Sequence, residues 1–182
     1  MKKSLLLIAA FILLQACLPN KQPQIVTVED KYELTLPGSL AKTNDLNEDA
    51  SLQYQNLFKE FYVIAIDEPK ADMHDALVEY ELLDVYSDDI EGYSELIFDS
   101  LRESLLNYEQ SEVIETTVNG LPAKLTSISG TIEGIDAFYT VGIYEGAERY
   151  YQVLVWTSQS YKERYETKMF DVLYSMNEVV GE

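Results

Sequence analysis

Residues 149–157 read Arg149-Tyr150-Tyr151-Gln152-Val153-Leu154-Val155-Trp156-Thr157. Successive side chains of a β-strand point to opposite faces of a sheet, so this stretch would place aromatic and aliphatic residues on both faces. One face would carry Tyr150, Gln152, Leu154 and Trp156, and the other Tyr151, Val153, Val155 and Thr157. We expect core and cross-strand packing here. An exposed aromatic patch for a protein or a glycan stays open, because the sequence does not show which face the helices cover.

Further strands are predicted on either side of this stretch. Residues 134–144 precede it across Glu145-Gly146-Ala147-Glu148 and add Tyr139 and Tyr144 to the aromatic set. Residues 112–118 and 122–129 flank Asn119-Gly120, the favoured pair for a tight hairpin turn. Near the start, residues 32–36 alternate up to Pro37-Gly38, and residues 51–56 and 61–66 form a second antiparallel pair. The chain is therefore rich in antiparallel strands.

Two helices stand out by their periodicity. Residues 89–108 place apolar side chains three and four residues apart, and acidic residues suit their amino end. A last helix is predicted from Ser160, whose spacing to Glu163 matches a capping box. Its apolar face consists of Tyr165, Met169, Val172, Leu173 and Met176. Residues 69–87 suggest a short helix and a loop. Together these patterns predict an α+β fold with a central antiparallel β-sheet flanked by helices.

The order of these elements resembles the PsbP-like family. The resemblance covers nearly all of residues 31–178 and is carried by the segments 32–37, 46–54, 118–123 and 150–157 with the helix that follows. It implies an αβα sandwich and a binding or assembly role. The family includes photosystem PsbP proteins, a nuclear Ran-binding protein and bacterial lipoproteins of unassigned role. Because their partners differ so widely, no functional residue is transferred.

The amino-terminal residues are typical of a lipoprotein signal. Lys2 and Lys3 precede an apolar run that is too short for a transmembrane helix, and residues 14–17 read Leu14-Gln15-Ala16-Cys17. This motif is similar to the bacterial lipobox, which implies cleavage before Cys17 and a diacylglycerol on its sulfur. The alternative is an ordinary signal peptide beside a bystander cysteine. Cys17 is the only cysteine of the chain, and an unpaired cysteine in an exported protein calls for an explanation.

The domain organisation follows from this signal. We expect a signal peptide over residues 1–16, a lipid-anchored tether over residues 17–30 and a single domain over residues 31–182. With one cysteine, the fold has no disulfide and must rest on its hydrophobic core. The predicted location is the bacterial cell envelope, outside the cytoplasm, while the membrane and leaflet stay open.

The net charge of the chain limits the classes of partner that we expect. The sequence holds 32 acidic and 13 basic residues, a formal net charge of −19. Such a surface repels nucleic acid and anionic lipid headgroups, so neither is expected as a partner. The predicted partners are the membrane, through a lipid on Cys17, and an envelope protein.

The sequence offers little for catalysis. His74 is the only histidine and lies in an irregular segment, so a solvated or capping role is expected. Asp45, Asn47 and Asp49 match the first ligand positions of an EF-hand loop, but Ala50 and Asn56 occupy its glycine and glutamate positions. We therefore predict no metal, no cofactor and no catalytic residue. A non-catalytic binding or assembly module is expected, and a carboxylate-based glycosidase is the alternative, since its two carboxylates are selected by their separation in space.

Overall fold

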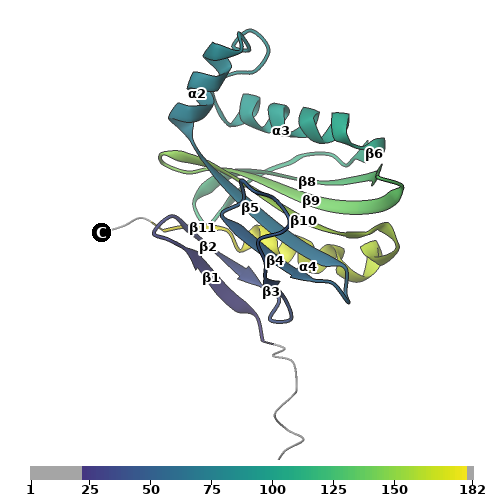
Figure 1. The fold of residues 1–182 in the computed structure, drawn as a ribbon. Helices are drawn as coiled ribbons and strands as arrows, with labels where there is room; N and C mark the ends of the chain where they lie inside the picture. The colour runs from purple at the N-terminus through teal and green to yellow at the C-terminus, as the bar shows by residue number, and fades with distance from the viewer. Residues whose placement is uncertain (1–21, 180–182) are drawn as a thin grey trace, which may run out of the picture.

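The structure is a computed structural model that describes residues 22–179. The predicted signal peptide and the lipobox residues Leu14, Gln15, Ala16 and Cys17 lie outside the described residues. These residues form two antiparallel sheets and three α-helices, which Figure 1 shows in chain order.

The larger sheet has eight antiparallel strands. Seven follow the order β3-β4-β5-β10-β9-β8-β6, and β7 pairs with β8 beside them. The strands are β3 (Ala41–Lys42), β4 (Leu52–Asn56), β5 (Phe61–Pro69), β6 (Leu106–Gln110), β7 (Ile114–Val118), β8 (Leu121–Ile132), β9 (Ile135–Glu145) and β10 (Arg149–Ser158). Residues 149–157 thus lie in β10, between β5 and β9.

The smaller sheet consists of β1 (Gln24–Val28), β2 (Tyr32–Leu36) and β11 (Asn177–Glu178), with β2 in the middle. Strand β1 corrects the predicted boundary at residue 30, because residues 24–28 pair with β2 instead of forming part of a tether. Val26 and Val28 also pack against the core. The prolines at positions 19 and 23 and the short alternation concealed this strand in the sequence.

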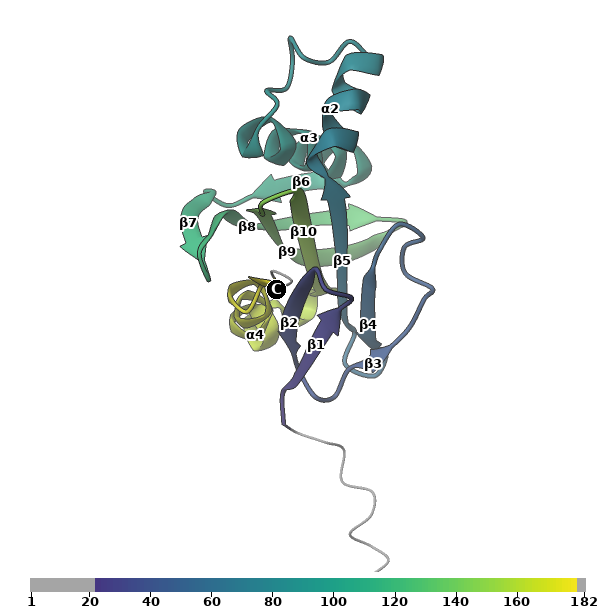
Figure 2. The ribbon, with the colours of Figure 1, turned by 90° about the vertical axis from the view of Figure 1, so that its left-hand side faces the viewer.

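The helices lie on both faces of the larger sheet. They are α2 (Lys70–Glu79), α3 (Ile90–Ser104) and α4 (Lys162–Tyr174), the last preceded by a 3₁₀ turn over Gln159–Tyr161. Figure 2 shows α2 and α3 above the sheet, and α4 with the smaller sheet below it. This arrangement confirms the predicted α+β fold with an antiparallel sheet between helices.

Two hairpins explain much of the strand register. Asn119 and Gly120 both have positive φ angles, 48° and 91°, and connect Val118 to its partner Leu121 as predicted. Glu133 and Gly134 have φ angles of 52° and 82° and connect β8 to β9 in the same way. Two-residue turns with positive φ at both positions match the right-handed twist of paired strands.

Two predicted helix boundaries were wrong. The helix expected over residues 89–108 ends at Ser104, and Leu105 leaves it in an extended conformation that leads into β6. The expected capping box at Ser160 does not form, since α4 begins at Lys162 without a side-chain cap. Ser160 lies in the 3₁₀ turn instead, and its hydroxyl bonds to that of Ser158. Asp89 does cap α3, accepting a hydrogen bond from the Gly92 amide.

The face below the larger sheet holds the main core. The apolar stripe of α4 is buried as predicted, and Met169, Leu173 and Met176 are inaccessible to solvent. Tyr144 crosses this core and donates a hydrogen bond of 2.7 Å to the carbonyl oxygen of Leu173. Its ring lies over Gly142, where an added Cβ would meet the hydroxyl oxygen at 2.3 Å. Gly142 is thus required by the close approach of Tyr144.

The two sheets are also joined by a cluster of ion pairs around one buried carboxylate. The carboxylate of Asp67 in β5 is only 4 % exposed and contacts Lys31 at 3.1 Å and Arg149 at 2.7 Å. Lys31 lies directly before β2, so this cluster ties the smaller sheet to β5 and β10 of the larger one. The pairing of one carboxylate with two cations offsets part of the cost of burying its charge.

Candidate functional site

The candidate site is a row of aromatic side chains on the upper face of the larger sheet. The strand registers place Tyr62 of β5 opposite Trp156 of β10, and Trp156 opposite Tyr139 of β9. All three side chains are half-buried. We call Tyr62, Trp156 and Tyr139 the aromatic row.

The helices above the sheet cover only part of this row. Towards β8 the row continues to Ile128, which is buried under α3 with 1 % exposure. Towards β4 it continues to the half-buried Gln55. Tyr139 packs against the core under α2 and α3, whereas Tyr62 and Trp156 belong to neither hydrophobic cluster of the described part. The helices therefore cover one half of this face and leave the Tyr62 half accessible.

The rings of the row stack on one another. The Trp156 and Tyr62 rings are 5.1 Å apart between centroids with an angle of 14° between their planes. The Trp156 and Tyr139 rings are 6.3 Å apart at 27°. Because these two tyrosines lie on opposite sides of β10, both faces of the indole are occupied. The row presents ring edges to its surroundings, which suits packing against protein side chains and leaves Trp156 without an open face for a sugar ring.

The two tyrosines of the row stay neutral at physiological pH. Burial raises the pKa of Tyr139, and burial together with the nearby charge of Glu60 raises the pKa of Tyr62. Each phenol thus keeps its proton as a hydrogen-bond donor. A half-buried row that combines ring edges with neutral hydroxyl groups is chemically suited to a protein interface.

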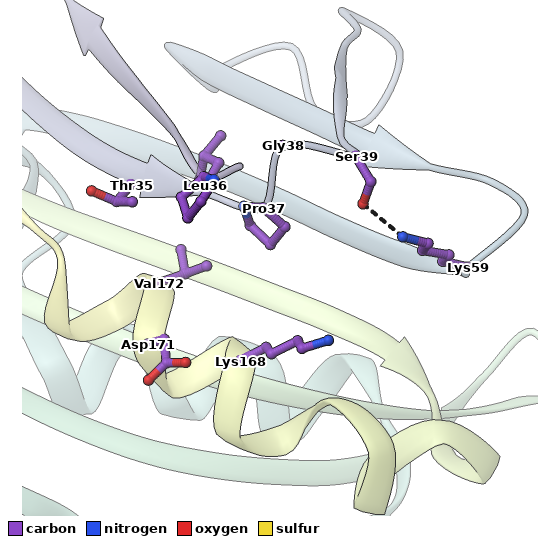
Figure 3. Close-up of a pocket in the computed structure, with 10 residues that line it drawn as sticks. Thr35, Leu36, Pro37, Gly38, Ser39, Lys59, Lys168, Asp171 and Val172 are labelled. Atoms are coloured by element: carbon purple, nitrogen blue, oxygen red, sulfur yellow. Dashed lines mark hydrogen bonds between the residues drawn. The ribbon is translucent and has the colours of Figure 1, made fainter. Parts of the chain in front are cut away.

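A separate cavity of about 520 Å³ lies below the sheet, beside the end of β2. Its apolar wall comes from Leu36, Pro37 and Val172, and Pro23 closes it next to β1. Figure 3 shows Lys59 and Lys168 reaching into it from the β4–β5 turn and from α4. The Lys59 ammonium donates a hydrogen bond of 2.9 Å to the hydroxyl of Ser39.

This cavity does not supply the carboxylate pair that glycoside hydrolysis uses. Asp171 is the one carboxylate among its lining residues, and two are required. A carboxyl group with a raised pKa exists elsewhere, at Glu68 of β5, where burial is the main cause. Glu68 pairs with Tyr150 across the strands and does not line the cavity. This cavity therefore offers no carboxylate pair for the glycosidase alternative.

The remaining residues singled out in the sequence have local roles. His74 of α2 is exposed, and its Nδ1 lies 2.6 Å from a carboxylate oxygen of Asp88 in the following loop. The segment Asp45–Asp49 forms a polar loop in which the Gln53 side chain accepts hydrogen bonds from the amides of Leu46 and Asn47. Within residues 22–179, no group of three or more potential metal ligands is present. Helices in this part of the chain are all too short or too polar to span a membrane.

Sequence reasoning identified Trp156 and Tyr139 as part of an aromatic set but missed Tyr62. Whether these side chains pack in the core or form an exposed patch depends on where the helices stop covering the sheet. No local sequence pattern encodes that position. Tyr62 is the second residue of β5, and its neighbourhood with Trp156 could be found only from the pairing of β5 with β10.

Comparison with known proteins supports the fold. No protein-family model matches the sequence, and no curated protein does. Among solved structures, cyanobacterial PsbP (CyanoP) from Synechocystis sp. PCC 6803 is similar with a TM-score of 0.60 and 9 % identity, over 90 % of this chain and 96 % of that one. The Ran-binding protein Mog1p of Saccharomyces cerevisiae is similar with a TM-score of 0.54 and 8 % identity, over 88 % and 97 %. The chain therefore has a PsbP-like fold, as the sequence pattern predicted.

Proposed function

We propose that this chain is a lipid-anchored protein of the bacterial envelope that binds a protein partner, without catalysis, through its aromatic row. The observation that carries the proposal is the half-covered sheet face. Tyr62 and Trp156 stay accessible beside a core in which comparable side chains, such as Tyr144 and Tyr151, are at most 2 % exposed.

The chemistry of the row favours a protein surface as its partner. Aromatic side chains are enriched in protein interfaces, where they bury much area with little loss of side-chain entropy. The formal charge of −19 further favours a partner whose contact surface is neutral or basic, since like charges across an interface are costly. Mog1p, which shares the fold, is itself a Ran-binding protein, so this fold can serve binding.

The test of the row is site-specific cross-linking in cells. A photoreactive phenylalanine analogue replaces Tyr62, and the matched control replaces Tyr174 of α4, which is 48 % exposed on the opposite face. A discrete cross-linked protein from position 62, absent from position 174 and lost when Trp156 is changed to Ala, supports the proposal. Equal cross-linking from both positions contradicts it.

The proposed lipid anchor at Cys17 is inferred from the sequence motif alone, so it is tested separately. Replacing Cys17 with Ser should remove labelling by fatty acid and release the chain from membranes. A Cys17→Ser chain that still incorporates fatty acid and still fractionates with membranes would contradict the lipoprotein assignment. The alternative, a carboxylate-based hydrolase, is not favoured by any group in the cavity.

A further inference from the structure

The end of the molecule at which β1 begins has an unusual surface. In Figures 1 and 2 this lower end gathers the start of β1, strand β3, the β4–β5 turn and α4, while α2 and α3 lie at the other end. We call residues 56–60, the β4–β5 turn, the hairpin tip. At this tip Phe58 is fully exposed and Leu57 is 65 % exposed.

The hairpin tip is held in place by hydrogen bonds. The amides of Lys59 and Glu60 donate to the carbonyl oxygens of Asn56 and Leu57 at 3.1 and 3.3 Å. The Asn56 side chain donates to the carbonyl oxygen of Ser39 at 2.7 Å. Leu57 and Phe58 are thus presented by a braced turn. Both side chains thus forgo the favourable free energy that burial of apolar surface would provide.

Basic residues of the described part divide into two sets. One set forms ion pairs with carboxylates and consists of Lys31, Lys70, Arg102, Lys124 and Arg149. The second set, for which no ion pair occurs within residues 22–179, consists of Lys42, Lys59, Lys162, Arg164 and Lys168. These unpaired cations come from β3, the hairpin tip and the first turns of α4, all at the lower end.

Contacts relate three of the unpaired cations, Lys59, Lys168 and Arg164, to the tip. Lys59 and Lys168 line the same cavity. Tyr165 of α4, one residue from Arg164, packs edge-on against Phe61 at 5.4 Å, directly behind the tip. The acidic residues in these segments are Glu60, Glu163, Glu166 and Asp171, so the lower end is close to neutral in a chain of formal charge −19. The repulsion from anionic headgroups that the sequence predicts is therefore weakest here.

The start of the described chain lies at the same end. Pro23 lines the cavity together with Lys59, and Gln24 donates hydrogen bonds to the carbonyl oxygens of Pro37 and Leu40. Pro23, directly before β1, is only six positions after Cys17 in the sequence. Even fully extended, this segment reaches about 20 Å, at about 3.3 Å per residue. A lipid on Cys17 would hold the lower end within that distance of the membrane.

We propose that the hairpin tip contacts the membrane surface, with Leu57 and Phe58 in the headgroup boundary and the unpaired cations facing the headgroups. This inference rests on the proposed anchor at Cys17, and it adds an orientation: the lower end faces the lipid, and α2 and α3 face away from it. Apolar side chains flanked by cations suit the interfacial layer of a bilayer.

The test uses the full chain, reconstituted with its native amino terminus into vesicles of phosphatidylcholine and phosphatidylglycerol. A bimane label is placed on Phe58→Cys, and the matched control carries it on Val85→Cys, which is 62 % exposed in the loop between α2 and α3. Brominated lipids quench a label that reaches the bilayer. Strong quenching at position 58 with little at position 85 is the expected result. The chain without an added cysteine reports whether Cys17 itself takes the label.

The outcomes separate the tip from the anchor. Flotation with the vesicles but equal quenching at positions 58 and 85 would overturn the tip contact and leave the anchor standing. If the Cys17→Ser chain also floats and position 58 is still quenched, the tip contact stands and the anchor is wrong. No flotation of either chain would overturn both. If the fluorescence emission of the label at position 58 shifts in native envelopes but not in lipid vesicles, the tip contacts a protein partner, and the lipid contact is rejected.

Discussion

The two faces of the larger sheet are built from the same kind of strand but are closed to different degrees. Below the sheet, α4 and the smaller sheet bury Tyr151, Val153, Val155 and Thr157 of β10 to 2 % exposure or less. Above it, the same strand has Tyr150 buried under α3, while Gln152, Leu154 and Trp156 stay half-buried. One strand thus serves a closed core on one side and a surface on the other. The difference shows that an apolar face stays partly accessible to solvent where its helix cover ends.

The largest effect is expected on the closed face. Replacing Leu173 with Ala should lower the free energy of unfolding by about 2–5 kcal/mol, because its side chain is inaccessible and a cavity would remain. Denaturant melts measure the change. A cost as small as that of a surface substitution would mean that α4 does not close this face in solution.

A second variant tests how tightly the closed face is packed. Replacing Gly142 with Ala should cost about 1–3 kcal/mol, because the new Cβ would overlap the Tyr144 ring and break its bond to Leu173. The control repeats the substitution in a Tyr144→Leu background, where the cost should largely vanish. An equal cost in both backgrounds would place its origin in the backbone of β9 instead of in the ring.

On the open face, the interaction energy between two side chains should be smaller than the losses of stability expected on the closed face. A double-mutant cycle of Tyr62→Ala and Trp156→Ala should give an interaction energy of about 0.5–1.5 kcal/mol, the range of a stacked aromatic pair. Both variants should remain folded, since neither side chain belongs to a buried cluster in the described part. A coupling near zero would indicate that the rings do not stack in solution and that their faces are free for a ligand.

The smallest effects are expected for the lysines of α4. Lys168→Ala should change the free energy of unfolding by no more than about 0.5 kcal/mol, as is usual for surface positions. Lys162→Ala should cost slightly more, because its ammonium lies 4.6 Å from the centre of the Phe138 ring. Thermal melts of the two variants side by side provide the measurement. A larger loss for Lys168 than for Lys162 would contradict this placement of the two side chains.

The secondary structure was largely readable from local sequence. The pair Asn119-Gly120 predicted its hairpin because both positions need positive φ, which these residues tolerate well. The spacing of Tyr165, Met169, Val172 and Leu173 predicted the buried stripe because helical periodicity fixes which side chains share a face. Errors arose where tertiary contacts overrode local signals. Leu105 is 6 % exposed and packs with the core under α3, which turns the chain out of the helix into β6.

By itself, the sequence determined the acidic composition, the alternation of β10, the two kinds of element and the resemblance of residues 14–17 to a lipobox. The last three depend only on residues close together in the chain. Only the tertiary structure decided which side of β10 is covered, because that depends on where α3 ends over strands from distant parts of the sequence. The pairing of β1 with β2, the stacking of Tyr62 on Trp156, and the meeting of Lys59 with Lys168 at one cavity were decided in the same way. These contacts join segments that are far apart in the sequence and therefore leave no periodic pattern in it. They contribute to stability only when the folded chain brings the segments together.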